Sequence, residues 1–149
     1  MPAPSAVDDF LDVMHTLRRE CAWTASQTHE SLRPYLLEEA EEVAEAIDSG
    51  DPDKLRDELG DLLFQVFYHS AIAEERGDFT FDDVVVGLTA KLKRRNRHVF
   101  GDLRGTNPSI DEIHKIWNDA KAAERGFDTP AATQPPTDAP AATQPPVIE

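Results

Sequence analysis

Residues 32–67 read LRPYLLEEAEEVAEAIDSGDPDKLRDELGDLLFQVF, and this stretch decides the fold class of the chain. Each half carries apolar residues at steps of three and four, which is the periodicity of one face of an α-helix. Between the halves, the residues SGDP at 49–52 supply turn and capping chemistry. A connection this short forces the two helices to run antiparallel. The stretch therefore predicts a helical hairpin.

Two pairs of acidic residues occupy equivalent places in this hairpin. Glu39 and Glu42 stand three residues apart, so they neighbour each other on the first helix. Glu58 and Asp61 have the same spacing in the second helix, and a shift of 19 residues maps the first pair onto the second. Equivalent flanks of antiparallel helices fall on one side, so we predict that the four carboxylates converge. The apolar positions that the same shift relates are Leu36, Ala40, Val43 and Ile47 in the first helix and Leu55, Leu59, Leu62 and Val66 in the second.

Four clustered carboxylates repel one another and raise each other's pKa unless a cation neutralises them. Their hard oxygen atoms suit Mg²⁺ or Mn²⁺, which also bind substrate phosphates. The alternative is that the acids only solvate a helix surface, which is the interpretation we give to Glu38, Glu41 and Glu45. Gly60 lies within the second helix, where glycine costs about 1 kcal/mol relative to alanine. It therefore indicates either tight helix packing or access for a metal.

Helical periodicity continues through most of residues 1–126, and no segment shows convincing strand alternation. The exception is residues 21–31, a polar connector in which we expect Trp23 to be buried. The pattern predicts an all-α bundle of four or five helices. The expected helices are 8–19, 32–48, 53–76, one from the cap Thr80 to about Val99 that Gly101 ends, and one that opens with a capping box at Ser109 and Glu112.

The last part of the chain has a different composition. The sequence PAATQPP occurs twice, at 130–136 and 140–146, in a segment rich in proline, alanine, threonine and glutamine. With so few large apolar residues, this segment cannot bury enough surface to offset the entropy lost on ordering. We therefore predict a helical domain over residues 1–126 and a disordered tail over residues 127–149. A polyproline II docking peptide is the alternative for the tail.

Composition limits the function classes. The chain has 149 residues and a formal net charge of −14, from 15 Lys and Arg against 29 Asp and Glu. This charge weighs against nucleic-acid binding, which depends on neutralising phosphates with basic side chains. We expect no membrane span and no secretory signal, and the single cysteine, Cys21, indicates the reducing cytoplasm. An anionic ligand would therefore need metal ions or a local basic cluster.

The acidic motif and its surroundings resemble the MazG family of all-α nucleoside triphosphate pyrophosphohydrolases. The family pattern EExxE…ExxD is matched here by EEAEE at 38–42 and ELGD at 58–61. The resemblance extends over roughly residues 8–125. Its further parts are Trp23, QTHESLRP at 27–34, Leu37, the leucines at 62–63 and HVFGD at 98–102.

This resemblance implies hydrolysis of a nucleoside triphosphate between its α and β phosphates, which gives a monophosphate and pyrophosphate. It also implies that Glu38 activates or orients water. We expect a broad base preference and a role in clearing unwanted nucleotides. The alternatives are an enzyme selective for dUTP or dCTP, and a catalytically silent helical module that binds a nucleotide or a partner protein. The implied Mg²⁺ ligands are Glu39, Glu42, Glu58 and Asp61.

The second half of the chain supplies positive charge. The resemblance assigns Lys91 and Arg95 to triphosphate contacts, with Arg94 as the neighbouring candidate. The alternative is that these cations only favour the negative end of a helix dipole. Trp117 and Lys121 resemble a Trp-x-x-x-Lys element of the family that assists catalysis or substrate binding. The alternative for Trp117 is a place in the core.

Two departures from the family pattern bear on these expectations. The family often has Cys-Pro-Trp-Asp where this chain has CAWT at 21–24, which removes a proline and an acid from a connector that helps form the nucleotide-side wall. Many MazG proteins also carry two tandem domains, whereas this chain carries one followed by the tail. One unit has too little core for so many apolar faces, so we predict a homodimer with two sites.

Overall fold

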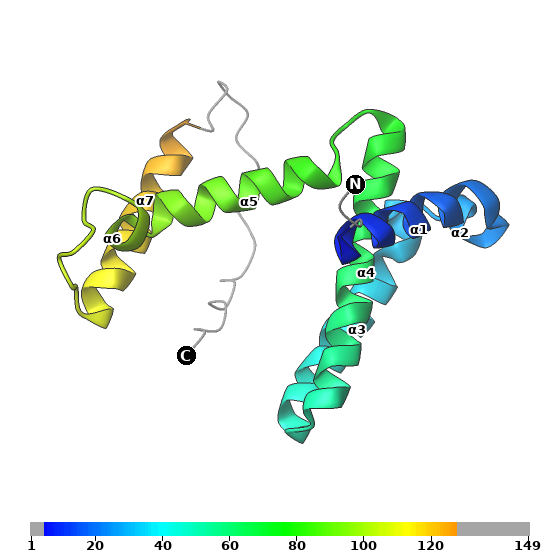
Figure 1. Cartoon of the computed structure of the whole chain (residues 1–149), viewed down its shortest axis with the longest axis horizontal. Helices are drawn as coiled ribbons and strands as arrows, with labels where there is room; N and C mark the ends of the chain where they lie inside the picture. Colours follow the sequence, from blue (N-terminus) through cyan, green and yellow to red (C-terminus); the bar gives the residue numbers. More distant parts are fainter. Residues whose placement is uncertain (1–4, 128–149) are drawn as a thin grey trace, which may run out of the picture. The chain divides into compact units, whose positions relative to one another are not determined.

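Helices form all the regular secondary structure that the computed structural model describes, which covers residues 5–127 (Figure 1). Five helices are long and two are short, which confirms the predicted all-α fold. No helix within these residues is both long and apolar enough to cross a membrane. Apart from Phe127, which ends α7, the predicted tail lies outside the described residues. The helices are α1 (Ala6–Glu20), α2 (Ala22–Ser26), α3 (His29–Ser49), α4 (Pro52–Arg76), α5 (Phe81–Arg95), α6 (Arg97–Phe100) and α7 (Ile110–Phe127).

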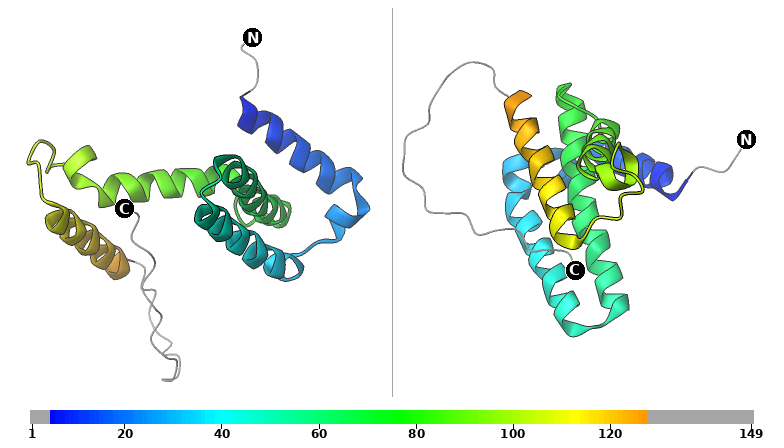
Figure 2. Two further views of the ribbon diagram at one scale, coloured as in Figure 1. Left: turned by 90° about the horizontal axis from the view of Figure 1, so that it is seen from below. Right: turned by 90° about the vertical axis from the view of Figure 1, so that its left-hand side faces the viewer.

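The chain divides into two compact units between Lys91 and Leu92, within α5. The first unit contains α1 to α4 and most of α5, and the second contains the end of α5 with α6 and α7. The most extensive packing in the first unit joins α3 to α4, which lie side by side in both views of Figure 2. The helical hairpin expected from residues 32–67 is therefore present.

The ends of the hairpin helices follow the residues that the sequence places there. Gly50 ends α3 in the left-handed region at φ 68°, which glycine adopts without the steric cost of a Cβ. The Asp51 side chain then accepts hydrogen bonds from the amides of Asp53 (3.0 Å) and Lys54 (3.3 Å). This satisfies two of the unpaired amides at the start of α4, where Pro52 has no N–H to satisfy.

The core of the first unit lies in the C-terminal half of α4, away from the acidic residues. Phe67 is central: its ring stacks on Phe81 of α5 with centroids 4.0 Å apart, and it meets Phe10 of α1 in an edge contact at 4.7 Å. These aromatic contacts fix α1 and the start of α5 against the hairpin. The buried core residues are Met14, Leu32, Phe67, Tyr68, Ala71 and Ile72.

The segment between α1 and α3 differs from the predicted connector. Residues 22–26 form α2, and Thr28 begins α3 through a reciprocal capping box with Ser31, earlier than expected. Trp23 is 56% exposed, so the expectation of a buried tryptophan is wrong. The buried residue of this segment is Thr24, because its carbonyl oxygen accepts hydrogen bonds from Arg18 of α1 and Tyr68 of α4.

Arg18 of α1 is the residue that holds this segment. Its Nη1 donates to the carbonyl oxygens of Thr24 (2.6 Å) and Gln27 (3.2 Å). Its Nε and Nη2 donate to the two carboxylate oxygens of Glu75, at 2.8 and 2.6 Å. The guanidinium also lies over the ring of Tyr68, whose hydroxyl donates to the same Thr24 carbonyl at 2.8 Å. With only 8% of the Arg18 side chain exposed, these bonds form in a partly desolvated site.

The expected helix from Thr80 to Val99 is interrupted. α5 ends at Arg95, and Asn96 separates it from α6 with φ −108° and ψ 58°, so the prediction of one continuous helix is wrong. The Asn96 side chain donates to the carbonyl oxygen of Leu92 at 2.8 Å. Such a local side-chain bond competes with the backbone bonds that would continue the helix.

We predict that Arg18→Ala lowers the free energy of unfolding by about 2–3 kcal/mol, because it leaves the Thr24 and Gln27 carbonyls and Glu75 without their charged donor. Urea denaturation followed by circular dichroism measures the change. Arg19→Ala is the matched control, since Arg19 forms an exposed pair with Glu20, and we expect it to change stability by less than about 0.5 kcal/mol. Equal effects of the two substitutions would contradict this account.

Candidate functional site

Two of the predicted acids lie on the interior face of the hairpin, where its two helices meet. Buried or half-buried residues recur at 32, 36, 39, 43 and 46 in α3, and at 55, 58, 62, 65 and 69 in α4. Glu39 and Glu58 therefore lie on the faces through which the helices meet, whereas the sequence placed them on a flank. The predicted apolar face is correspondingly wrong at its exposed members, which are Ala40, Ile47, Leu59 and Val66.

Three of the four predicted acids come together. Glu39, Glu58 and Asp61 each bring one carboxylate oxygen to within 4.8 Å of the others, so one acid from α3 meets two from α4. Glu42 is half-buried on α3 and lies outside this spacing, although its charge acts on both Glu39 and Glu58. Glu38 is exposed beside Glu39.

The environment of the cluster disfavours its negative charges. Burial raises the pKa of Glu39, and the charges of Asp61 and Glu42 raise it further. Burial likewise raises the pKa of Glu58, again assisted by Glu42 and Asp61. The Oε2 atom of Glu39 is buried and has no hydrogen-bond partner within the described residues. The pKa values of both glutamates rise for the same reason, because their carboxylates are removed from water and face like charges.

The donor set fits a hard divalent cation. The nearest arginine along α4, Arg56, pairs with Asp53 (3.0 Å) and Asp57 (3.6 Å) and not with the cluster. An unpartnered, buried carboxylate oxygen beside two further carboxylates is the arrangement that Mg²⁺ or Mn²⁺ would complete. Glu39, Glu58 and Asp61, with Glu42 beside them, are therefore the residues that could hold a metal.

Gly60 is not explained by packing within the chain. A Cβ added there would meet no atom within 4 Å among the described residues. Of the two interpretations that the sequence offers for this glycine, tight packing against another helix of the first unit is therefore wrong. The exposed backbone at Gly60 lies next to Asp61, on the side where a ligand or another chain could approach.

The second unit brings two of the predicted basic residues, Arg94 and Arg95, to one carboxylate. Arg94 and Arg95 both donate to Glu124 of α7, and the Arg95 guanidinium also lies over the Trp117 ring, 5.2 Å from its centroid. Trp117 is half-buried and carries this arginine on its face. Lys121 is half-buried on the same helix, and Lys91 is exposed on α5 in the first unit.

Sequence reasoning missed Glu124. Its signal is the spacing Trp117, Lys121, Glu124, at steps of four and three, which places the three residues on one face of α7. Trp117 and Lys121 were predicted as site residues, whereas Glu124, about one helical turn after Lys121, was not.

A pair of histidines was also missed, because its members are 40 residues apart and no local spacing relates them. His29 at the start of α3 and His69 of α4 face each other with their Nδ1 atoms 2.7 Å apart. Burial lowers the pKa of His69, and the charge of His29 lowers it further. The pair joins the two helices of the hairpin beyond the acidic cluster.

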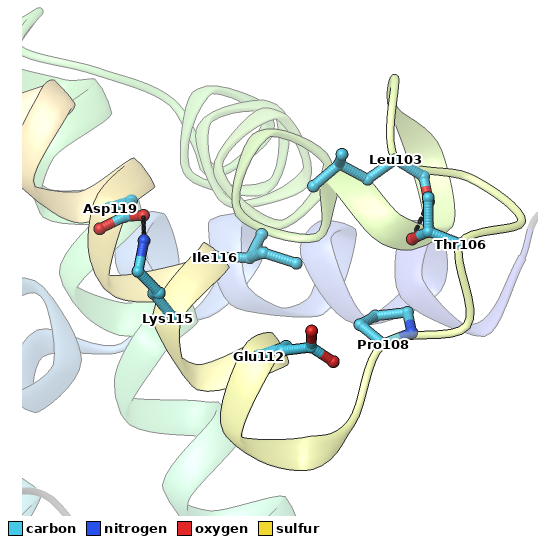
Figure 3. A pocket seen from close by; sticks show the side chains of 7 residues that line it. All are labelled: Leu103, Thr106, Pro108, Glu112, Lys115, Ile116 and Asp119. Carbon is cyan, nitrogen blue, oxygen red and sulfur yellow. Dashed lines mark hydrogen bonds and ion pairs between the residues drawn. The ribbon is translucent and has the colours of Figure 1, made fainter.

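A shallow cavity of about 320 Å³ lies in the second unit, between the loop that follows α6 and the first turns of α7 (Figure 3). Lys115 on its rim pairs with Asp119 at 3.0 Å, and the Glu112 carboxylate accepts hydrogen bonds from the Ser109 amide and hydroxyl, so the charged groups of the cavity are already engaged. The cavity contains none of the predicted site residues.

Comparison with known proteins places these features in a family. Residues 27–100 match the model of the MazG nucleotide pyrophosphohydrolase domain. The chain is 47% identical over 121 residues to the nucleoside triphosphate pyrophosphohydrolase/pyrophosphatase MazG of Thermotoga maritima, covering 80% of this chain and 45% of that protein. It is 43% identical over 122 residues to the nucleoside triphosphate pyrophosphohydrolase of Escherichia coli K12, covering 80% and 46%. The chain thus spans less than half the length of these relatives.

A solved structure resembles the fold. The crystal structure of a mazG-related protein from Thermotoga maritima superposes with a TM-score of 0.66 and 27% sequence identity, over 76% of this chain and 97% of that one.

We predict that Glu39→Gln raises the thermal midpoint of the chelator-treated protein at pH 7 by a few degrees, because it removes a half-buried charge that faces other carboxylates. The sign follows from the raised pKa of Glu39: its proton favours the folded state, and that contribution is lost as pH rises through the raised value. The difference between variant and unmodified protein should therefore shrink as pH falls.

Thermal unfolding followed by circular dichroism over a range of pH measures this difference. Glu41→Gln serves as the control, since Glu41 is exposed two residues after Glu39, which places it on the opposite side of α3. A lower midpoint for Glu39→Gln, or a difference that grows on acidification, would show that the Glu39 charge is not under repulsion.

Proposed function

This chain belongs to the MazG nucleotide pyrophosphohydrolase family, and we propose that it hydrolyses nucleoside triphosphates to a monophosphate and pyrophosphate. The observation that carries the proposal is the unneutralised cluster of Glu39, Glu58 and Asp61 across the hairpin. Such a cluster is costly to stability unless a cation joins it, which supports a functional reason for its presence. The names of the relatives from Thermotoga maritima and Escherichia coli give the reaction class.

We propose that Mg²⁺ is the metal, held by Glu39, Glu58 and Asp61 with Glu42 beside them. When bound, Mg²⁺ neutralises the carboxylates, screens the triphosphate and lowers the pKa of coordinated water. Glu38, exposed next to Glu39, would accept a proton from water or orient it. The half-buried faces of α3 and α4 limit access of bulk water to the Glu39 side chain.

The basic residues are proposed as triphosphate ligands. Arg95, with its guanidinium oriented by Trp117 and Glu124, can donate to phosphate oxygens. Arg94 and Lys91 would add positive charge, and Lys121 lies on the Trp117 face of α7. These assignments rest on the resemblance together with the described arginine contacts.

An exposed pair of aromatic rings on the first unit offers a surface on which the base of a nucleotide could stack. Trp23 and Tyr35 meet edge to face with centroids 6.5 Å apart, and both rings are substantially exposed. Tyr35 stands one helical turn before Glu39 on α3, so the pair lies next to the acids along that helix. Because every base has an aromatic face, contact with such rings favours a broad base preference.

Clearance of unwanted nucleotides in the cytoplasm is the role that we propose.

We also propose that two copies of the chain form a homodimer. The hairpin exposes large apolar residues, and α5 has no buried residue and exposes valines and leucines. Apolar surface of this extent is typical of a protein interface. A second copy fits because three of the exposed hairpin residues, Ile47, Leu59 and Val66, are ones that the sequence placed on the apolar faces of the two helices. Leu37 and Leu63 of the hairpin are exposed as well.

We predict that Glu58→Ala and Asp61→Ala each reduce Mg²⁺-dependent pyrophosphate release by roughly 100-fold or more, because each removes an oxygen ligand from a shared site. Identification of products from a panel of ribo- and deoxyribonucleoside triphosphates measures the rate and the base preference together. Asp57→Ala is the control, since Asp57 is exposed and near Arg56, and it should retain activity. Normal turnover by both site variants, with the helical circular dichroism signal intact, would refute the site.

We predict that Leu63→Glu shifts the protein from dimer to monomer in sedimentation velocity, because it places a charge on the exposed apolar face of the hairpin. Ile110→Glu, an equally drastic change at an exposed residue of the second unit, should leave the dimer intact. An unmodified protein that sediments as a monomer at micromolar concentration would overturn the homodimer.

A further inference from the structure

Glu124 of α7 accepts hydrogen bonds from two consecutive arginines of α5. Arg95 donates from Nη2 to Oε2 at 2.6 Å and from Nε to both oxygens at 3.2 and 3.3 Å. Arg94 donates from Nε to Oε1 at 2.9 Å, with its Nη2 2.8 Å from the same oxygen. Among residues 5–126, no other carboxylate pairs with two arginines.

The contacts constrain the two arginines unequally. The Arg95 side chain is 16% exposed and lies between the Glu124 carboxylate and the Trp117 ring, whereas the Arg94 side chain is 52% exposed. Nε and Nη2 of Arg95 face Glu124, which leaves its Nη1 amino group as the donor for a ligand. A guanidinium fixed on two sides loses little further freedom when it binds an anion.

The charge balance leaves the group attractive to anions. Two guanidinium groups share one carboxylate, so the trio carries a net charge of +1. The hydrogen bonds from Arg95, followed by those from Arg94, hold the pKa of Glu124 at about 2. Glu124 is therefore ionised throughout the range in which a triphosphate is fully charged.

We propose that Glu124 is a positioning residue that fixes Arg95, and secondarily Arg94, for contact with triphosphate oxygens. The proposal rests on the triphosphate pyrophosphohydrolase function proposed above. Two other roles differ in their consequences. As a purely structural link between α5 and α7, Glu124 would affect stability alone. As a counter-ion that masks the arginines, it would weaken anion binding.

The test compares Glu124→Gln, Arg95→Ala and the double variant in Mg²⁺-dependent pyrophosphate release. Glu124→Gln should raise KM about tenfold with a smaller change in kcat, because Arg95 binds phosphates in the ground state and the transition state alike. In the Arg95→Ala background the same substitution should change KM less than about twofold, since both substitutions remove one interaction. Asp119→Asn, which breaks the exposed pair with Lys115 on the same helix, should change neither constant.

Binding of inorganic tripolyphosphate, measured by calorimetry in Mg²⁺ buffer, gives a readout that does not require turnover. Glu124→Gln should weaken it about tenfold, in step with KM. Tighter binding would establish a masking counter-ion and overturn the proposal. Additive effects of Glu124→Gln and Arg95→Ala, or a loss of kcat at unchanged KM with a lowered thermal midpoint, would establish a structural link and overturn it equally.

Arg95→Lys keeps the inference testable if Glu124→Gln does not fold, since lysine retains the charge and loses the planar fork. It should raise KM and weaken tripolyphosphate binding, and an unchanged KM would overturn the proposal. An unmodified protein that releases no pyrophosphate would refute the proposed function, and the tripolyphosphate arm would still decide whether Glu124 orders an anion site.

Discussion

Repulsion among carboxylates held across one helical hairpin is the constraint on which this structure depends. Glu39 lies on the interior face of α3, where apolar residues precede and follow it, and it meets Glu58 and Asp61 of α4. Burial and like charge both oppose its ionisation. The hairpin tolerates this because its stability comes from elsewhere: the aromatic core lies toward the C-terminal half of α4, around Phe67 and Tyr68. The acidic cluster thus lies in the N-terminal half of α4, and the core lies in its C-terminal half.

The hairpin itself could be predicted from sequence because local rules specify it. Periodicity indicated both helices, and Gly50 with Asp51 fixed the turn through backbone freedom and capping. The face of the acids was predicted wrongly for a physical reason. Ile47, Leu59 and Val66 are apolar and helically spaced, yet they are exposed. Periodicity identifies an apolar face, and it does not distinguish a face buried within the chain from one available to another chain.

Side-chain contacts between separate elements account for two of the other differences. Thr24 is buried because Arg18 and Tyr68 converge on its carbonyl oxygen, and no local pattern around Trp23 contains that information. The same holds for Glu124, which meets Arg95 from 29 residues away. Spacing along α7 offered a usable signal there, whereas the break at Asn96 depends on one local hydrogen bond that competes with an otherwise helical pattern. Contacts between elements are therefore what the sequence leaves undetermined.

Anomalous diffraction from crystals of the unmodified protein grown with Mn²⁺ tests most directly whether the carboxylates of the hairpin share a metal. We expect an anomalous peak within coordination distance of carboxylate oxygens from both α3 and α4, bonded to Glu39, Glu58 and Asp61. No peak at the hairpin, or a peak bound by residues of one helix alone, would contradict it.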